Sequence, residues 1–255
     1  MTPDGFQVAG YSEAFKGTGR VTVTRGNADL NPERSVTLDG GVGFERPSLG
    51  ISMDLTYFHT EVEDRIATWT VRRSALPLEI LDGDTVTART TYLNSNASRM
   101  RGLEGRFSGD IGTLLAWDRS LRLFANSTWM LEAVDETVIP TRDGLEDSLT
   151  QESDIKNVGK VNTVFGIEYD DRTFLSTRLA GRYIGKRLDT DFNDPRLPDI
   201  EYPRFQLFDI ALRLRFGREN GISLAVTNVT NENYYEKRGF NLPGRDYRVG
   251  YTHTF

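Results

Sequence analysis

The feature that most constrains this chain is a two-residue alternation of apolar and polar side chains, which recurs along most of its length. In residues 51–57 (ISMDLTY) the apolar side chains occupy the odd positions, and in residues 208–216 (FDIALRLRF) the large apolar ones occupy the even positions. Successive side chains of a β-strand point to opposite faces, so this period predicts strands with one apolar and one polar face. The spacing of three and four residues that marks helices is hard to find. The chain is therefore predicted to be all-β.

The predicted strands are long, and charged residues occupy the middle of their polar faces. We expect about ten strands, several much longer than the usual length of about 5–6 residues. The mid-strand charges are Glu104, Arg106, Arg122, Glu168, Arg178, Arg182, Asp209, Arg213 and Arg215. Unpaired charges are costly to bury in the core of a soluble β-sandwich, which is the alternative fold. An antiparallel transmembrane β-barrel gives them a wet lumen and turns the apolar face to lipid, so we predict this fold.

In such a barrel, the odd positions of 161–169 and the even positions of 208–216 are expected to face outward. Short connections at 46–48, 111–119, 170–172 and 217–220 alternate with long polar ones at 74–86, 135–156, 187–203 and 230–245. Bacterial outer-membrane barrels have short periplasmic turns and long outer loops. The alternation predicts a protein of the cell outer membrane, with membrane lipid around its apolar face.

The last stretch, residues 247–255, alternates aromatic and apolar residues with polar ones. Tyr247, Val249, Tyr251 and Phe255 share one parity and are expected at the periplasmic rim, where aromatic girdles lie. This ending resembles the assembly signal of outer-membrane barrels. The barrel assembly machinery is therefore an expected partner.

Composition argues against several classes of function. The 31 basic and 37 acidic residues are interspersed and give a net charge of −6, so nucleic acid is an unexpected partner. The chain has no cysteine, and its two histidines, His59 and His253, are far apart and share the apolar parity of their strands. We expect no cofactor, no metal site and no catalytic residues.

Four stretches resemble the family of TonB-dependent outer-membrane receptors. They are GNADLNPERS (26–35), YFHTEVEDRI (57–66), YLNSNASRMRGLEGRF (92–107) and the closing segment from Val226 to Phe255. In the closing segment the matching positions are Asn228, Asn231, Tyr234, Gly239, Pro243, Gly244, Arg245 and Gly250. The family imports metal chelates and cobalamin-like nutrients, so the resemblance implies energy-coupled uptake of a siderophore-like chelate or a cobalamin-like nutrient.

The resemblance also implies how residues 1–255 relate to a whole receptor. They correspond to the C-terminal portion of a barrel of about 22 strands, in which an N-terminal plug domain fills the lumen and meets the TonB complex. No plug is recognised in this chain. A half-barrel would expose two sheet edges in lipid, so we expect a fragment, a truncated gene product or one piece of a split receptor.

Candidate ligand-binding residues are few. Tyr234, Tyr235 and Phe240 in the last long loop could stack on a chelate or pack the loop itself. The acidic loop from Asp189 to Asp199 has oxygen ligands at alternate positions, but Asp194 replaces the glycine of a calcium loop, so a solvated loop is favoured. Two other functions stay open: a small self-contained barrel acting as an arginine-lined channel, or a ten-strand outer-membrane protease with carboxylates at its rim.

Overall fold

The structure is a computed structural model that describes residues 1–72, 78–141, 144–191, 198–217 and 219–254. Its contacts divide the chain into two compact units. Unit 1 comprises Met1–Leu38, His59–Met100 and Ala133–Asp154, and unit 2 comprises Asp39–Phe58, Arg101–Glu132 and Ile155–Phe255. The described residues are mostly in strands, with few and short helices, which confirms the predicted all-β class. No helix among them is long and apolar enough to cross a membrane.

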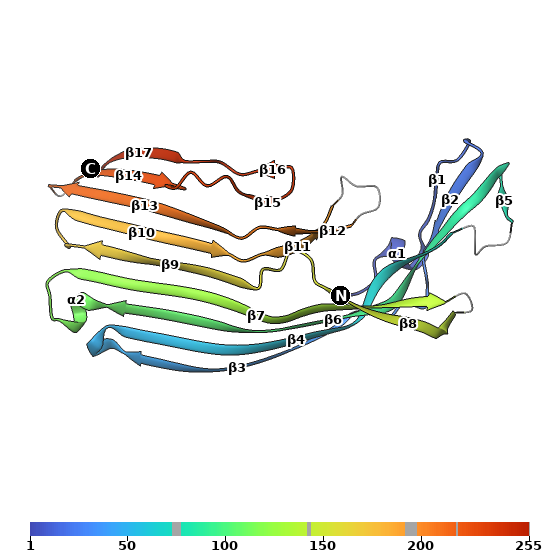
Figure 1. The fold of residues 1–255 in the computed structure, drawn as a ribbon, viewed down its shortest axis with the longest axis horizontal. Coiled ribbons are helices and arrows are strands. Elements are labelled where there is room, and N and C mark those ends of the chain that lie inside the picture. Colours follow the sequence, from blue (N-terminus) through green and yellow to red (C-terminus); the bar gives the residue numbers. More distant parts are fainter. Residues whose placement is uncertain (73–77, 142–143, 192–197, 218, 255) are drawn as a thin grey trace. The chain divides into compact units, whose positions relative to one another are not determined.

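Unit 2 is built on neighbouring strands that lie side by side in one sheet (Figure 1). In spatial order they are β3 (Arg34–Arg46), β4 (Ile51–Arg72), β6 (Asp84–Asp110), β7 (Ser120–Thr141), β9 (Val161–Asp170), β10 (Leu175–Ile184), β13 (Phe205–Phe216), β14 (Asn220–Thr227) and β17 (Asp246–His253). All pairs from β7 to β17 are antiparallel. β4 and β7 have 22 residues each and β6 has 27, so the predicted excess length is confirmed.

The register of these strands separates an apolar face from a polar one. One row of directly opposed residues runs across six strands through Leu123, Ile167, Leu179, Ile210, Val226 and Tyr247. In the row beside it, the rings of Phe165 and Phe208 meet edge to face, 6.3 Å apart, across Gly181. A Cβ atom at Gly181 would lie 2.5 Å from the Phe165 ring, so glycine is needed there. The side chains that were predicted to face outward from β9 and β13 thus form one continuous apolar surface.

The mid-strand charges occupy the opposite face, as predicted. Arg122, Glu168 and Arg178 stand directly opposite one another on β7, β9 and β10. The Glu168 carboxylate forms ion pairs with both arginines, at 3.1 Å to Nη1 of Arg178. Arg182 points to the same face of β10 as Arg178. On β13, Asp209 and Arg213 point to the same face as Ala211, which lies opposite Arg178. These charges therefore share one polar face.

Unit 1 contains the other ends of the long strands together with β1 (Tyr11–Ala14), β2 (Arg20–Arg25), β5 (Ile80–Leu81), β8 (Gly144–Asp154) and the short helix α1 (Gly5–Ala9). Its buried core is small and consists of Val21, Val23 and Val86, with Leu81 packed against it. β2 pairs with β6 in parallel, which departs from the predicted purely antiparallel sheet. The buried carboxylate of Asp84 accepts the backbone N–H groups of Gly17 and Gly19 and so holds the turn before β2 against β6.

The long connections are not plain loops, which corrects the prediction. Within 135–156, β7 continues to Thr141 and pairs with β8, with Val134 opposite Asp154. The described part of 187–203 contains β11 (Arg187–Thr190), which pairs with β12 (Asp199–Tyr202), and residues 230–245 contain β15 (Tyr235–Lys237) and β16 (Phe240–Asn241). Their sequences lack an apolar parity because a hairpin outside lipid needs no apolar face. Alternation therefore could not reveal them.

Short connections join the strands at the opposite end of unit 2. The 3-10 helix η1 (Pro47–Leu49) links β3 to β4, and the helix α2 (Ile111–Leu114) begins the connection from β6 to β7. The connection at 217–220 includes residue 218, which lies outside the described residues. These positions agree with the predicted short turns.

The last strand, β17, forms the edge of unit 2. Tyr247, Val249 and Tyr251 share one parity and are 65%, 78% and 65% exposed. Phe255 lies outside the described residues. The role of these four residues in barrel assembly stays a prediction.

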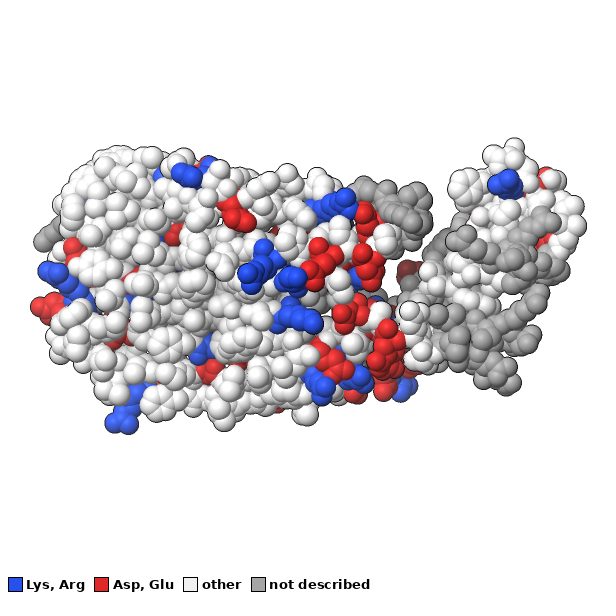
Figure 2. All heavy atoms as spheres, in the orientation of Figure 1, with Lys and Arg blue, Asp and Glu red and all other residues white. Residues whose placement is uncertain are grey.

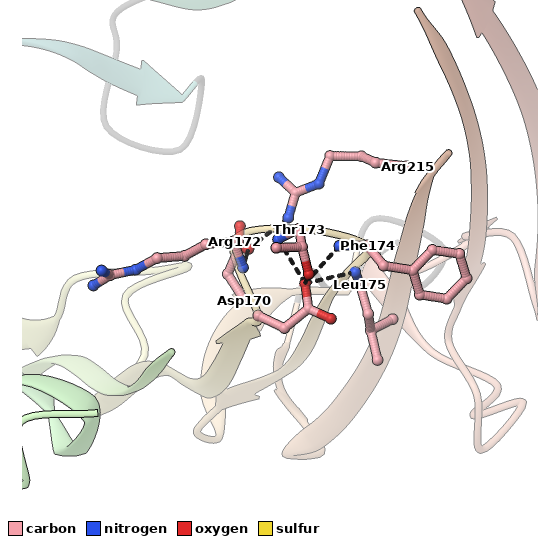
Figure 3. A network of polar contacts seen from close by, with 7 residues as sticks. Asp170, Arg172, Thr173, Phe174, Leu175 and Arg215 are labelled. Atoms are coloured by element: carbon pink, nitrogen blue, oxygen red, sulfur yellow. Dashed lines mark hydrogen bonds and ion pairs between the residues drawn. The ribbon is translucent and has the colours of Figure 1, made fainter. Parts of the chain in front are cut away.

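The turn between β9 and β10 is built around Asp171 (Figure 3). Its Oδ1 atom accepts backbone N–H groups from Thr173, Phe174 and Leu175 at 2.8, 2.7 and 2.9 Å. The hydrogen bond from Leu175, helped by the others and opposed by burial, lowers the pKa of Asp171 to about 2. Arg172 adopts a left-handed conformation with φ of 64°, which lets the chain reverse within the four residues 171–174.

This turn predicts a specific acid sensitivity. Because the folded-state pKa of Asp171 is depressed, its stabilisation is complete above its ordinary pKa and is lost as the pH falls from about 4 to about 2. The free energy of unfolding of Asp171→Asn, measured by tryptophan fluorescence in detergent micelles, should decline less steeply over that window than that of the parent. Asp118→Asn, in another short connection, is the control. Parallel declines for the parent and Asp171→Asn would contradict the assignment.

The two faces of β10 predict opposite responses to a new charge. Leu179→Arg places a guanidinium in the apolar row, where lipid contact should cost about 2–4 kcal/mol of unfolding free energy. Ala180→Arg places the same group on the polar face, opposite Asp209, and should cost much less. Denaturant titration in lipid vesicles, followed by heat-modifiable gel mobility, measures both. Equal destabilisation by the two variants would mean that both faces meet the same environment.

Candidate functional site

A large hollow of unit 2 lies on the polar face, near the end from which the long connections leave. It has a volume of about 710 Å³ and receives side chains from β4, β6, β7, β9 and β10, and from β11 and β15 beside them. Its polar lining consists chiefly of Asp54, Thr56, Glu104, Arg106, Asn126, Thr128, Asn157, Asn162, Arg182, Arg187 and Glu236. Figure 2 shows basic and acidic side chains gathered at the end of unit 2 where β11, β12 and β15 lie, beside a mostly uncharged expanse along the strands.

Two of the arginines in this hollow are held by neighbours. Nη2 of Arg182 lies 3.0 Å from Oε1 of Glu236, and Nη2 of Arg187 donates to the carbonyl of Tyr235 at 3.4 Å. The two guanidinium groups also lie 6.0 and 5.6 Å from the centre of the Phe205 ring. Both side chains are thereby oriented before any ligand arrives.

Arg106 and Glu104, on the same face of β6, differ from that pair. Both are exposed, and neither forms an ion pair with another residue that the structure describes. A guanidinium group and nearby amide side chains such as Asn126 and Asn162 are suited to hydrogen-bond anionic oxygen atoms. The hollow can therefore hold a small molecule that carries carboxylate, phenolate or similar oxygen groups.

The loops beside the hollow are joined by the buried pair Asp189 and Tyr202, which are only 3% and 1% exposed. The Tyr202 hydroxyl donates to Oδ2 of Asp189 at 2.7 Å and accepts the backbone N–H of Arg238 at 3.1 Å. Asn157 donates to Oδ1 of Asp189 at 3.2 Å. Burial alone would raise the pKa of Asp189, but the hydrogen bonds from Tyr202, Thr190 and Asn157 outweigh it and lower that pKa. The Asp189 carboxylate is thus hydrogen-bonded to Asn157 and Tyr202, and through Tyr202 it is linked to Arg238.

The three aromatic residues proposed from sequence lie in different environments. Tyr234 packs on Phe205, with ring centres 4.8 Å apart, and joins the buried cluster of Ile184, Phe205 and Leu207. Tyr235 meets the buried Tyr202 edge to face at 5.4 Å. Phe240 in β16 is 70% exposed. Packing accounts for the two tyrosines, Phe240 is the ring most open to a ligand, and binding by any of the three stays a prediction.

Sequence analysis missed several residues of the hollow. Asn157, Arg187 and Glu236 come from connections, where no alternation indicates which way a side chain points. Thr56, Asn126 and Asn162 lie in strands, and their polar parity could have marked them. Parity by itself does not show that strands β4 and β10 contribute to one hollow.

The acidic loop is held by hydrogen bonds and ion pairs in its described part. Asp191 pairs with Arg238 and Asp199 with Lys156, while both oxygens of Asp189 are occupied as described above. No group of three or more histidine, cysteine or acidic residues in the described part of the chain could hold a metal ion. Asn193 and Asp194 lie outside the described residues. A solvated, ion-paired loop remains the favoured interpretation.

Comparison with known proteins gives a consistent result. A family model described as "TonB dependent receptor-like, beta-barrel" matches residues 2–231. A mutant of the ferric enterobactin receptor PfeA from Pseudomonas aeruginosa is similar in structure, with a TM-score of 0.67 and 17% identity over 99% of this chain and 36% of that one. The siderophore receptor PirA from Acinetobacter baumannii has a TM-score of 0.64 and 18% identity over 92% of this chain and 34% of that one.

A third similar structure is the pyoverdine outer membrane receptor FpvA from Pseudomonas aeruginosa PAO1, bound to pyoverdine. Its TM-score is 0.64 and its identity 17%, over 90% of this chain and 31% of that one. At this identity the likeness concerns the fold. The chain thus spans about a third of the length of the solved structures it matches.

The hydrogen bond between Tyr202 and Asp189 predicts that the hydroxyl group of Tyr202 stabilises the surrounding loops. Tyr202→Phe removes the donor to Oδ2 of Asp189, while Oδ1 keeps Asn157 and Thr190, and should destabilise the contact between these loops by about 1–3 kcal/mol. Hydrogen–deuterium exchange at residues 187–190 and 235–241 should accelerate accordingly. Tyr235→Phe is the matched control, because it removes a hydroxyl from the other ring of the same aromatic pair. Exchange that is equally fast in both variants would exclude Asp189 and Tyr202 as the fastening pair.

Proposed function

Because the chain belongs to the TonB-dependent receptor-like β-barrel family, we propose that it forms part of the wall of a receptor that takes up a ferric siderophore across the cell outer membrane. The family match over residues 2–231 carries this proposal. The three similar structures are described as siderophore receptors or as receptors of enterobactin or pyoverdine, which favours an iron chelate over cobalamin. We assign residues 1–255 to the C-terminal portion of the barrel.

The polar hollow is the proposed place of ligand contact. Siderophores bind iron through oxygen-rich groups, and ferric chelates of this kind commonly carry negative charge. Arg106 offers a guanidinium that no carboxylate of the described residues neutralises, while Arg182 and Arg187 are already oriented. Such groups bind anionic oxygens through charge-assisted hydrogen bonds. Phe240 is proposed as an aromatic contact at the loop surface.

The partners follow from the same proposal. Lipid would cover the apolar rows of β7 to β17, and the barrel assembly machinery would insert the wall into the membrane. Energy coupling would reach the barrel from the TonB complex through a plug domain, which the barrel family match does not include. Each of these partners is inferred from family membership and from the polarity of the two faces.

The direction of the edge strands disfavours the channel and protease alternatives, which both need a self-closed barrel. In the described part of unit 2, successive neighbours alternate in direction from β3 to β17 (Figure 1). The path contains an odd number of strands, so β3 and β17 run the same way. Joining them would create a parallel seam, whereas bacterial single-chain barrels are antiparallel with an even number of strands. A wall completed by further strands is the better-supported reading.

Ligand titration of the purified receptor tests the proposed function. Intrinsic fluorescence should be quenched by a ferric catecholate or ferric hydroxamate added to the receptor that carries this chain, in detergent micelles. Cyanocobalamin should have no effect. Binding of cyanocobalamin together with no binding of either ferric chelate would overturn the siderophore assignment.

Arg106 is the residue with the clearest predicted effect on affinity. Arg106→Gln should weaken binding of an anionic ferric chelate about tenfold, equivalent to about 1.4 kcal/mol, because one charge-assisted contact is lost. Arg46→Gln, at the end of β3 and outside the lining of this hollow, should leave affinity unchanged. An unchanged dissociation constant for Arg106→Gln would remove this arginine from the ligand site.

A further inference from the structure

A second hollow lies on the same polar face of unit 2, close to the short connections rather than the loops. It has a volume of about 600 Å³ and receives residues from the end of β6, from β7, β9, β10, β13 and β14, and from the turn between β9 and β10. Four arginines line it, against three carboxylates. The arginines are Arg122, Arg172, Arg178 and Arg213, and the acids are Asp110, Glu168 and Asp170. The lining is therefore rich in guanidinium groups.

Each of the three carboxylates already has partners. Glu168 is shared by Arg122 and Arg178. Asp170 accepts from Nη2 of Arg215 at 2.5 Å. Asp110 accepts the hydroxyl of Ser120 and the backbone N–H groups of Gly112 and Leu121, at 3.0, 2.9 and 3.0 Å. No acid of the hollow is left to neutralise a further cation.

Two such cations remain, Arg172 in the turn between β9 and β10 and, on the strand wall itself, Arg213. Arg213 is exposed, and it forms no ion pair or side-chain hydrogen bond with any residue in the described part of the chain. Arg215, two residues along the same face of β13, is neutralised by Asp170, so the difference is specific to position 213. An exposed guanidinium in a concave, arginine-rich wall creates a local positive potential that attracts anions.

The neighbours of Arg213 suit an anion. Ser176 on β10 and Ser223 on β14 are directly opposite it on either side. Directly opposed side chains in a sheet have Cβ atoms about 5 Å apart, so one bound group can reach the guanidinium and one of the serine hydroxyls. Because the two serines are two strand spacings, about 10 Å, apart, a molecule with two acidic groups is needed to reach both. Ala211 and Ala225, in the adjoining row, are small and leave access to the guanidinium open. Ser223 itself makes only a long contact of 3.4 Å to the carbonyl of Gly250.

We propose that Arg213, with Ser176 and Ser223 on either side of it, binds the carboxylate or phosphate groups of a small anionic molecule. Guanidinium and hydroxyl donors match the oxygen atoms of both groups. The volume of the hollow is in the range of small-molecule sites, which favours a small ligand over an acidic polypeptide segment. None of the residues that line the first hollow, near the long connections, line this one. The proposed site goes beyond the proposed uptake function.

Residue-resolved protection measures this binding directly. Phenylglyoxal modifies accessible arginines, and the rate at each position can be followed by mass spectrometry of the detergent-solubilised receptor, with citrate as the anion. At citrate concentrations ten times the dissociation constant, modification of Arg213 should slow about tenfold. Arg248 is the internal control: it shares the polar face but its Nε already donates to Asp246 at 2.8 Å, so citrate should not protect it.

Substitution provides an independent measurement. By titration calorimetry, Arg213→Gln should weaken citrate binding about tenfold or more, and Arg213→Lys should retain part of it because the charge is kept. Arg248→Gln should bind as the parent does. Three results would overturn the proposal: equal modification rates of Arg213 with and without citrate, an Arg213 that is unreactive in both because protein covers it, or parental citrate affinity in Arg213→Gln.

Discussion

The cross-strand register of the antiparallel ladder is the constraint on which the rest of unit 2 depends. Side chains alternate along a strand, so a shift of one residue would move every apolar group of that strand to the polar face. The observed pairing keeps Ile167, Leu179 and Ile210 in one row and Glu168 and Arg178 in the next. Ion pairs and aromatic contacts follow from that alignment and reinforce it. The Phe165 ring, for example, requires a glycine opposite it at position 181.

The same ladder leaves β3 and β17 with unpaired backbone groups at the two edges of the unit 2 sheet. In hydrocarbon these groups need hydrogen-bond partners, and only a closed sheet supplies them all. Because both edge strands run the same way, an antiparallel wall is completed by an odd number of further strands. This requirement agrees with a chain that covers about a third of the length of the receptors it resembles.

The polar face carries two chemically distinct hollows. Near the loops, basic and acidic groups are balanced and several are held by loop contacts, notably Arg182 by Glu236. Near the short turns, the acids are held by local partners, and Arg172 and Arg213 form no ion pair with a described residue. Small residues are common in the second hollow and loop residues in the first. A receptor wall can therefore present different recognition chemistry at its two ends without any change in strand pattern.

The sequence by itself determined the all-β class, the long strands, the two faces and the alternation of short and long connections. These are consequences of a period of two, which is a local property and can be read without knowing which strands pair. The resemblance carried by the four quoted stretches also indicated the family correctly.

Tertiary structure alone decided which distant groups meet. Tyr202 reaches Asp189 over 13 residues and Arg238 over 36, so the fastening of the loops depends on how hairpins return to one another. Likewise Arg213 and Arg215 are equivalent in the sequence pattern, yet only Arg215 finds an acid, Asp170, 45 residues away. Register between strands sets these distances, and alternation within a strand carries no information about register.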